Sequence, residues 1–144
     1  MDEIRIIQGG ISIDERGTVK YVNDFIMNDV SRFYIIHHTN NNVVRAWQAH
    51  QFEKKYLYVL EGAFLFAFVK IDNWEQPSDN LCPIVITIHH YENKILCIPQ
   101  GYANGIKSIE PNSKVIVFSN KDLSESSEDI FRYDKDKWLD WNKY

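Results

Sequence analysis

Between Val43 and Phe64 the chain gathers polar side chains of the kinds that bind anions and move protons. The run VVRAWQAHQFEKKYLYVLEGAF contains an arginine, an amide, a histidine and two lysines, and it continues into an aromatic segment and a Glu-Gly turn. A second run, LCIPQGYANGI from Leu96 to Ile106, has the composition of a facing turn. Polar groups that converge on an apolar pocket are the usual form of a small-molecule site. We therefore expect the two runs to line one pocket in a small β-barrel.

Short strands separated by turns must position these side chains. The β-forming segments either alternate apolar and polar residues or are apolar throughout, and no long helical period is present. We expect strands over residues 4–7, 11–13, 18–22, 31–38, 43–50, 55–60, 63–71, 84–89, 94–98, 105–109 and 114–120. We expect turns at residues 9–10, 14–17, 61–62 and 99–101.

About ten short strands predict an all-β fold, either a barrel or a sandwich, and long apolar strands suit the inner face of a two-sheet jelly roll. The acidic residues 124–129 are expected to form a solvated loop. Residues 129–144 are expected to form one or two helical turns, with Trp138 and Trp141 packed on the barrel.

Length and composition limit the class of protein. The chain has 144 residues, so we expect one domain over residues 1–144. Its net charge of −4 argues against nucleic acid or an anionic membrane as the partner, although a local basic site for a phosphorylated small molecule is compatible with it. Cys82 and Cys97 form no Cys-x-x-Cys motif, and no signal peptide or membrane-spanning run is recognised, so we expect reduced thiols in a cytoplasmic protein.

The two runs also have the outline of a metal site that lacks its ligands. Barrels of the cupin kind often hold a metal through His-x-His, a nearby Glu and a His in a later Pro-x-Gly-x-x-His turn. Here Gln48 and His50 stand at the first pair, Lys54 and Lys55 where the Glu would be, and Asn104 at the last His. A lysine ammonium repels a cation, so we expect no metal at this place.

Three motifs carry a resemblance to known families. The run RAWQAH at residues 45–50 resembles the Arg-Gly-x-His-Ala-His stretch of the sugar-nucleotide 3,4-ketoisomerases, and the match runs without a gap from Arg32 to Gly62. The run DERG at residues 14–17 and the run IPQGYANG from Ile98 resemble motifs of the dTDP-4-dehydrorhamnose 3,5-epimerases. The resemblance covers the chain from about Ile11 to Trp141. It implies a metal-free jelly-roll cupin without a cofactor, usually a homodimer, that acts on a dTDP-4-keto-6-deoxyhexose.

Such enzymes remove a proton beside a keto group, which requires a base, a group that stabilises the enolate and an acid. Gln48 stands where these families have the base histidine, and an amide takes up no proton near neutral pH. His50, expected on the same strand face, is then the candidate base, and Lys55 matches a lysine near the reacting centre. The family's tyrosine acid is not matched near Val117 or Leu123. The candidates for the acid are Tyr34, Tyr58 and Tyr102.

The binding residues follow from the same resemblance. Arg45 matches the arginine that meets the diphosphate, and a guanidinium offers phosphate a fixed two-point fork. Arg16 matches an arginine that reaches a nucleotide in the neighbouring subunit. The implied catalytic set is His50, Lys55, Tyr34 and Gln48. The implied binding set is Arg16, Arg45, His38, Tyr58, Tyr102 and Asn104.

Two functions remain open at this point. The first is an isomerase or epimerase that acts on a nucleotide-linked 4-keto-6-deoxyhexose in deoxysugar or surface-polysaccharide biosynthesis. The alternative is a cupin that binds a sugar nucleotide but has lost the catalytic base, which the replacement at Gln48 favours. A metal-dependent dioxygenase is disfavoured by the missing ligands.

Overall fold

Residues 3–144 are described by the computed structural model, and their strands form two five-stranded antiparallel sheets and a separate hairpin. In spatial order, the first sheet contains β1 (Arg5–Gln8), β9 (Lys94–Ile98), β6 (Lys55–Glu61), β11 (Ser113–Ser119) and β4 (Arg32–His38). The second contains β12 (Phe131–Arg132), β5 (Val44–Ala49), β10 (Tyr102–Ser108), β7 (Ala63–Lys70) and β8 (Ile84–His89). The hairpin consists of β2 (Gly10–Asp14) and β3 (Gly17–Tyr21). The predicted all-β jelly-roll barrel is confirmed.

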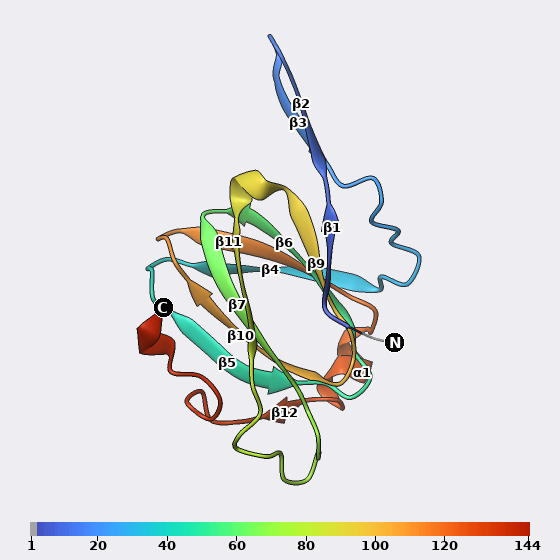
Figure 1. Cartoon of the computed structure of the whole chain (residues 1–144). Helices are drawn as coiled ribbons and strands as arrows, with labels where there is room; N and C mark the ends of the chain where they lie inside the picture. The colour runs from blue at the N-terminus through green and yellow to red at the C-terminus, as the bar shows by residue number, and fades with distance from the viewer. Residues whose placement is uncertain (1–2) are drawn as a thin grey trace.

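The two sheets enclose the core, and β7 shows how the sequence specifies this arrangement (Figure 1). Seven of its eight residues are buried, because both of its faces are covered. The residues that face the space between the sheets are Phe64, Phe66 and Phe68. The residues that pack with the C-terminal segment on the other face are Leu65, Ala67 and Val69. Two covered faces account for the uninterrupted apolar run, where a half-exposed strand would alternate.

The C-terminal segment lies against the outer face of the second sheet, as the tryptophans predicted. The rings of Trp138 and Trp141 lie 5.3 and 5.5 Å from the ring of Trp47 in β5. The expected helical turns are found only in the 3₁₀ turn η2 (Trp141–Lys143). The sequence did not predict β12, which pairs with β5 and extends the second sheet by one short strand.

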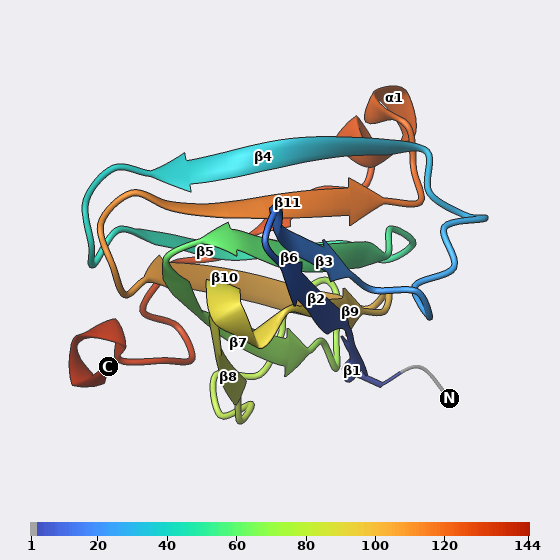
Figure 2. The ribbon, with the colours of Figure 1, turned by 90° about the horizontal axis from the view of Figure 1, so that it is seen from above.

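The segment after β11 differs from the expected solvated loop. It forms the short helix α1 (Leu123–Ser127), which begins with a capping box in which Asp122 and Glu125 each bond the backbone amide of the other. Figure 2 shows α1 beyond the end at which β4 begins and β11 ends. Behind this helix Asp129 is buried, so the acidic run contributes to the interior. No helix among residues 3–144 is long and apolar enough to cross a lipid bilayer.

The N-terminal strands also differ from the expectation at one point. Gly9 does not reverse the chain, because β1 continues directly into β2 (Figure 1). Its amide donates to the carbonyl of Asn93 at 2.9 Å, and a Cβ at this position would lie 2.3 Å from the carbonyl oxygen of Tyr21. The glycine is therefore required for a close approach of two backbones. The turn at residues 14–17 is confirmed, and its hairpin projects from the barrel (Figure 1).

Candidate active site

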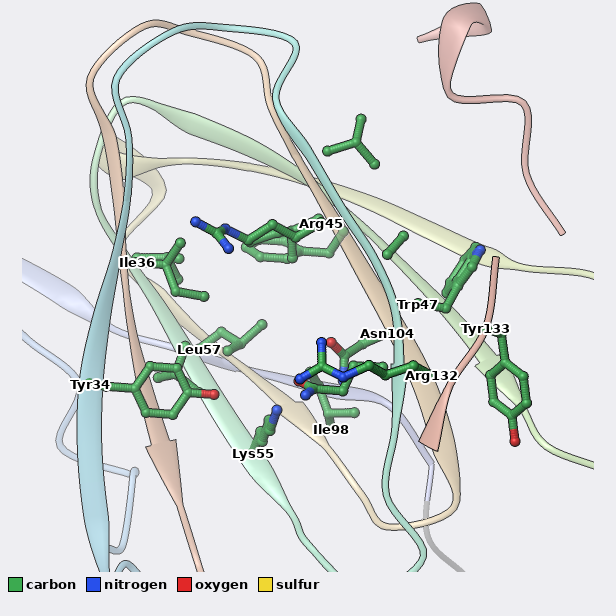
Figure 3. A pocket seen from close by; sticks show the side chains of 17 residues that line it. Tyr34, Ile36, Arg45, Trp47, Lys55, Leu57, Ile98, Asn104, Arg132 and Tyr133 are labelled. Carbon is green, nitrogen blue, oxygen red and sulfur yellow. The ribbon is translucent and has the colours of Figure 1, made fainter. Parts of the chain in front are cut away.

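A cavity of about 620 Å³ lies between the two sheets and combines an apolar wall with polar side chains (Figure 3). The apolar wall includes Leu57, Phe66, Ile98, Ile106, Val115 and Val117. The polar side chains that line it include Tyr34, Arg45, Gln48, Lys55, Asn104 and Arg132. Five of these six were predicted from the sequence, and the structure brings them to one place. Such a cavity has the size and composition of a small-molecule site.

The charged groups of the cavity are all positive. Arg45, Lys55 and Arg132 line it, whereas none of its lining residues among 3–144 carries a carboxylate or an imidazole. This concentration of positive charge occurs in a chain whose net charge is −4. Guanidinium and ammonium groups are donors only, so their natural partner is an anionic ligand rich in acceptor oxygens. The site is therefore suited to a phosphorylated or otherwise anionic small molecule.

Three neighbouring strands place a row of donors along one side of the cavity. Gln48 in β5 is paired in register with Asn104 in β10 on one side and with Arg132 in β12 on the other. In Figure 3 the side chain of Arg132 points into the cavity. The two amides stand where the resembling families have imidazoles, so this row can hold ligand oxygens but cannot take up a proton.

Arg45 is held in place by a buried histidine. Its Nε donates to Nε2 of His38 at 3.0 Å, and His38 is only 2% exposed. Burial lowers the pKa of His38, and the positive charge of Arg45 lowers it further. The ring is therefore neutral near pH 7 and can accept this bond. The two terminal nitrogens of Arg45 remain available for a ligand.

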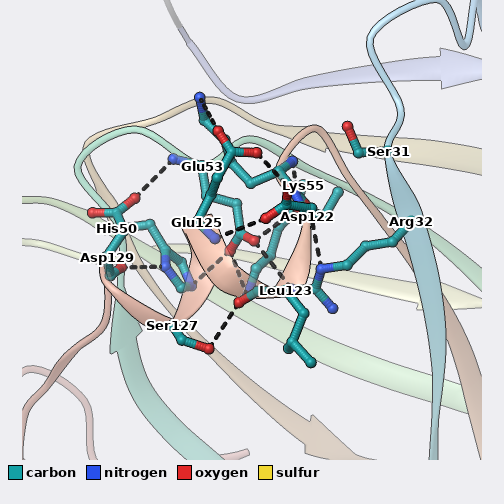
Figure 4. Close-up of polar contacts among 12 residues, drawn as sticks. Ser31, Arg32, His50, Glu53, Lys55, Asp122, Leu123, Glu125, Ser127 and Asp129 are labelled. Carbon is teal, nitrogen blue, oxygen red and sulfur yellow. Dashed lines mark hydrogen bonds and ion pairs between the residues drawn. The ribbon is translucent and has the colours of Figure 1, made fainter.

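Lys55 lines the cavity with a buried carboxylate behind it (Figure 4). Its Nζ lies 3.7 Å from Oε2 of Glu53, whose side chain has no exposed surface. The other oxygen, Oε1, lies 3.2 Å from the guanidinium of Arg32 and accepts a hydrogen bond from Ser119 at 2.8 Å. Burial alone would raise the pKa of Glu53, but the charges of Lys55 and His50 and the hydrogen bonds from Ser119 and Ser126 lower it overall. Glu53 is thus an ionised carboxylate beneath the cavity.

His50 does not line the cavity, contrary to the expectation that it shares a face with Gln48. The reason is local, because β5 ends at Ala49 and the chain then turns. The carboxylate of Asp129 accepts the amides of residues 51, 52 and 53 at 2.8, 2.9 and 3.0 Å and so fixes this turn. The ring of His50 is directed inward, with Nδ1 2.6 Å from the carbonyl oxygen of Asp129 and Nε2 3.1 Å from Oε2 of Glu53. Burial lowers its pKa, and the charge of Lys55 lowers it further.

Besides His38, which holds Arg45 but does not itself line the cavity, three other predicted residues lie outside it. The hydroxyl of Tyr58 donates to Asn93 at 2.6 Å, and the residues of β6 that line the cavity are Lys55 and Leu57. Tyr102 belongs to the buried core and not to the lining. Arg16 is 84% exposed on the hairpin and is paired with Asp14 at 2.6 Å. Within one chain these three residues do not reach a ligand in the cavity.

Two important residues were not predicted. Glu53 stands in a Glu-Lys-Lys run that resembles an exposed turn, and only its contacts with β4 and β11 reveal its burial. Arg132 lies in a segment expected to be helical, and it reaches the cavity because that segment pairs with β5 as a strand. In the sequence, the Asp122-x-x-Glu125 capping box is a local signal that a helix begins after β11.

The positions that carry metal ligands in metal-binding cupins do not form a donor set here. Of them only His50 has an imidazole, and both of its ring nitrogens face protein atoms. Among residues 3–144, no group of three or more His, Cys, Asp or Glu side chains is arranged to hold a metal ion.

Solved structures that superimpose on this chain include 3,4-ketoisomerases and dTDP-4-dehydrorhamnose 3,5-epimerases. A 3,4-ketoisomerase from Helicobacter canadensis superimposes with a TM-score of 0.73 at 17% identity, covering 92% of each chain. A dTDP-4-dehydrorhamnose 3,5-epimerase from Sulfolobus tokodaii gives 0.75 at 20% identity, covering 96% of this chain and 80% of that one. A variant 3,4-ketoisomerase from Thermoanaerobacterium thermosaccharolyticum, in complex with TDP-4-keto-6-deoxyglucose, gives 0.71 at 16% identity, covering 90% and 87%.

Comparison of the sequence alone finds no such relation. No protein-family profile matches the chain, and no curated protein matches it significantly. At 16–20% identity the structural likeness establishes the fold. The chain has the cupin fold of the sugar-nucleotide ketoisomerases and 3,5-epimerases.

Proposed function

We propose that the cavity binds a nucleotide-linked 4-keto-6-deoxyhexose, with dTDP as the nucleotide, and catalyses isomerisation or epimerisation of the sugar. The observation that carries the proposal is the cavity itself, where Arg45, Lys55 and Arg132 meet an apolar wall with no carboxylate or imidazole among the lining residues described. An anionic diphosphate suits the arginines, and a deoxyhexose ring with its methyl group suits the apolar wall. Neighbours in fold that act on such substrates support the choice of ligand.

The proposed reaction consists of proton transfers and needs no cofactor. A proton leaves the carbon beside the keto group, and the electron pair of that bond moves onto the keto oxygen to give an enolate. Arg132 and Lys55 lie in the cavity as cations that can stabilise the enolate charge. A proton then returns to the opposite face of the same carbon in an epimerisation. In a keto shift, the hydroxyl on that carbon gives its proton to the former keto oxygen, and a proton is added to the former keto carbon. Tyr34 and Lys55 are the lining residues that can exchange protons with the sugar.

A second candidate is a protein that binds the sugar nucleotide without converting it. The specific observation in its favour is that the lining residues described include Gln48 and Asn104, but no imidazole or carboxylate base. Under this reading the donors of the cavity hold the ligand, and Lys55 supplies charge but exchanges no proton with it.

We also propose that the protein forms a homodimer in which Arg16 reaches the nucleotide of the neighbouring subunit. Among residues 3–144 the hairpin β2–β3 pairs with no other strand, and an isolated two-stranded hairpin is marginally stable in water. Its residues Ile13 and Val19 are 75% and 64% exposed, which a second subunit would cover. Light scattering coupled to size exclusion should give twice the mass of one chain, and a monomer at micromolar concentration would contradict the proposal.

Proton exchange distinguishes the two functions. The purified protein is incubated with dTDP-4-keto-6-deoxyglucose in D₂O, and the sugar signals are followed by proton NMR. Catalysis predicts loss of the C3 or C5 proton signal at a rate above that of the protein-free control. Binding of dTDP by calorimetry with no exchange favours the second candidate. If dTDP does not bind at all, both functions are wrong.

A further inference from the structure

Among the residues that the structure describes, the lining of the cavity has no histidine or carboxylate that could act as a base, yet the imidazole of His50 lies close behind the lining. Lys55, which lines the cavity, lies next to a buried pair formed by Glu53 and His50, and Figure 4 shows these three residues. We propose that Lys55 becomes the catalytic base by passing its proton through Oε2 of Glu53 to Nε2 of His50. This inference rests on the proposed function, and it assigns to the reaction two residues that do not line the cavity.

The two oxygens of Glu53 have different surroundings. Oε1 is occupied by the guanidinium of Arg32 at 3.2 Å and by the hydroxyl of Ser119 at 2.8 Å. Oε2 lies 3.7 Å from Nζ of Lys55 and 3.1 Å from Nε2 of His50. One oxygen is therefore fixed by two donors, whereas the other is within hydrogen-bond distance of Nε2 and forms an ion pair with Nζ, which must approach by a turn of the lysine side chain before a proton can pass. Arg32 and Ser119 favour the carboxylate form of Glu53, so a proton that arrives at Oε2 does not stay there and passes to one of the two nitrogens.

The tautomer of His50 leaves the required position open. Its Nδ1 lies 2.6 Å from the carbonyl oxygen of Asp129, and a carbonyl only accepts, so Nδ1 carries the hydrogen. Nε2 then has a free lone pair, and it faces Oε2 of Glu53. Both atoms are buried, and neither has another hydrogen-bond partner in the structure. Buried polar atoms without partners are costly, and a proton received on Nε2 would satisfy both at once.

The transfer conserves the net charge of the cluster. Lys55 ammonium, Glu53 carboxylate and neutral His50 become Lys55 amine, Glu53 carboxylate and imidazolium. The lone pair of the amine then takes the proton beside the keto group, which restores the ammonium next to the new enolate. The other charged groups of the cluster are the guanidinium of Arg32 and the carboxylate of Asp129. Burial, the main cause of the lowered pKa of His50, remains after the transfer, whereas the second cause, the charge of Lys55, is removed by it.

His50→Asn is the variant that cuts this path while keeping the local structure. The Asn amide can still donate to the carbonyl of Asp129 as Nδ1 does, but it has no equivalent of Nε2. Glu53→Gln is the second variant, because an amide at this position passes no proton. Each variant is compared with wild type in the D₂O exchange assay and in binding of dTDP. Exchange should fall by about 100-fold or more in both, with dTDP affinity unchanged. Exchange at the wild-type rate in His50→Asn would overturn the inference.

A second readout decides the relay even if the protein converts no sugar. Brief reductive methylation followed by peptide mass spectrometry measures how readily each lysine reacts as a free amine. The adjacent Lys54 is the internal control, because it is half-buried and lies outside the cavity lining. Without its proton acceptor, Lys55 of His50→Asn should react about tenfold more slowly relative to Lys54 than in wild type. An unchanged ratio would mean that His50 is only structural, which overturns the inference. Failure of the proposed function appears separately, as a wild type that does not bind dTDP.

Discussion

Replacement of Arg45 by glutamine should remove the main phosphate contact of the cavity. The Nε of Arg45 is engaged with His38 at 3.0 Å, so the two terminal nitrogens are the donors left for a ligand. Because His38 is buried and fixed, the guanidinium is already oriented and little side-chain entropy is lost on binding. Glutamine keeps part of the aliphatic stem but has no charge. The variant therefore measures how much the charged guanidinium group of Arg45 contributes to binding.

The expected loss follows from the number of bonds removed. A hydrogen bond to a charged group contributes about 1.5–3 kcal/mol, and Arg45 lies at an exposed position where the lower value applies. Two such bonds give about 3 kcal/mol, which corresponds to an affinity about 100-fold weaker. Part of this difference should disappear at high ionic strength, since the contact is electrostatic and open to solvent.

Isothermal titration calorimetry with dTDP measures this affinity directly. Arg5→Gln is the matched control, because Arg5 is an exposed arginine on β1 outside the cavity lining, and its replacement should leave the affinity unchanged. Circular dichroism and urea unfolding establish that both variants are folded. If Arg45→Gln binds dTDP within about threefold of wild type, Arg45 lies outside the phosphate site and the reasoning is refuted.

Three further predictions concern the reaction, the pH dependence and the fold. Lys55→Met should lower deuterium exchange by about 100-fold or more, while calorimetry should show unchanged dTDP affinity because the phosphate arginine is untouched. Burial lowers the pKa of both His38 and His50 below the ordinary 6.5, so the folded protein resists protonation that the unfolded chain accepts. The free energy of unfolding in urea should therefore be constant above pH 6.5 and fall as the pH drops below it. Each ring should contribute a slope of up to about 1.4 kcal/mol per pH unit. A free energy of unfolding that does not change with pH would contradict this. Gly105→Ala would place a Cβ 2.7 Å from the buried ring of Trp141, so urea unfolding should show a loss of about 1–3 kcal/mol, and unchanged stability would mean that the C-terminal segment yields freely.

The sequence predicted the barrel well because its strands carry their own signals. Alternation in residues 84–89 and the apolar run at residues 63–71 define strands without reference to partners. The turn glycines and the polar tips fix most of the reversals. Gly9 was misread because a close backbone approach and a turn select glycine equally, and only the position of Tyr21 separates them.

Most of the polar residues that line the candidate site were predicted from the sequence, whereas the arrangement of the buried residues behind the lining was not. Arg45, Lys55 and Asn104 could be placed by resemblance, because strand register carries them to one cavity. The burial of Glu53 depends on Arg32, which is 21 residues away in the chain, and local composition holds no information on that contact. His50 was misplaced for a related reason, since the end of β5 is fixed by the carboxylate of Asp129, far along the chain.

A crystal structure with dTDP-6-deoxyglucose, which lacks the keto group and cannot react, tests the central claim most directly. The diphosphate should lie against the terminal nitrogens of Arg45, and the hexose should lie against the apolar wall. Nζ of Lys55 should lie within about 3–3.5 Å of C3 or C5, the distance at which a proton can be taken. A ligand bound outside the cavity, or a sugar with both carbons beyond the reach of Lys55, would contradict the account.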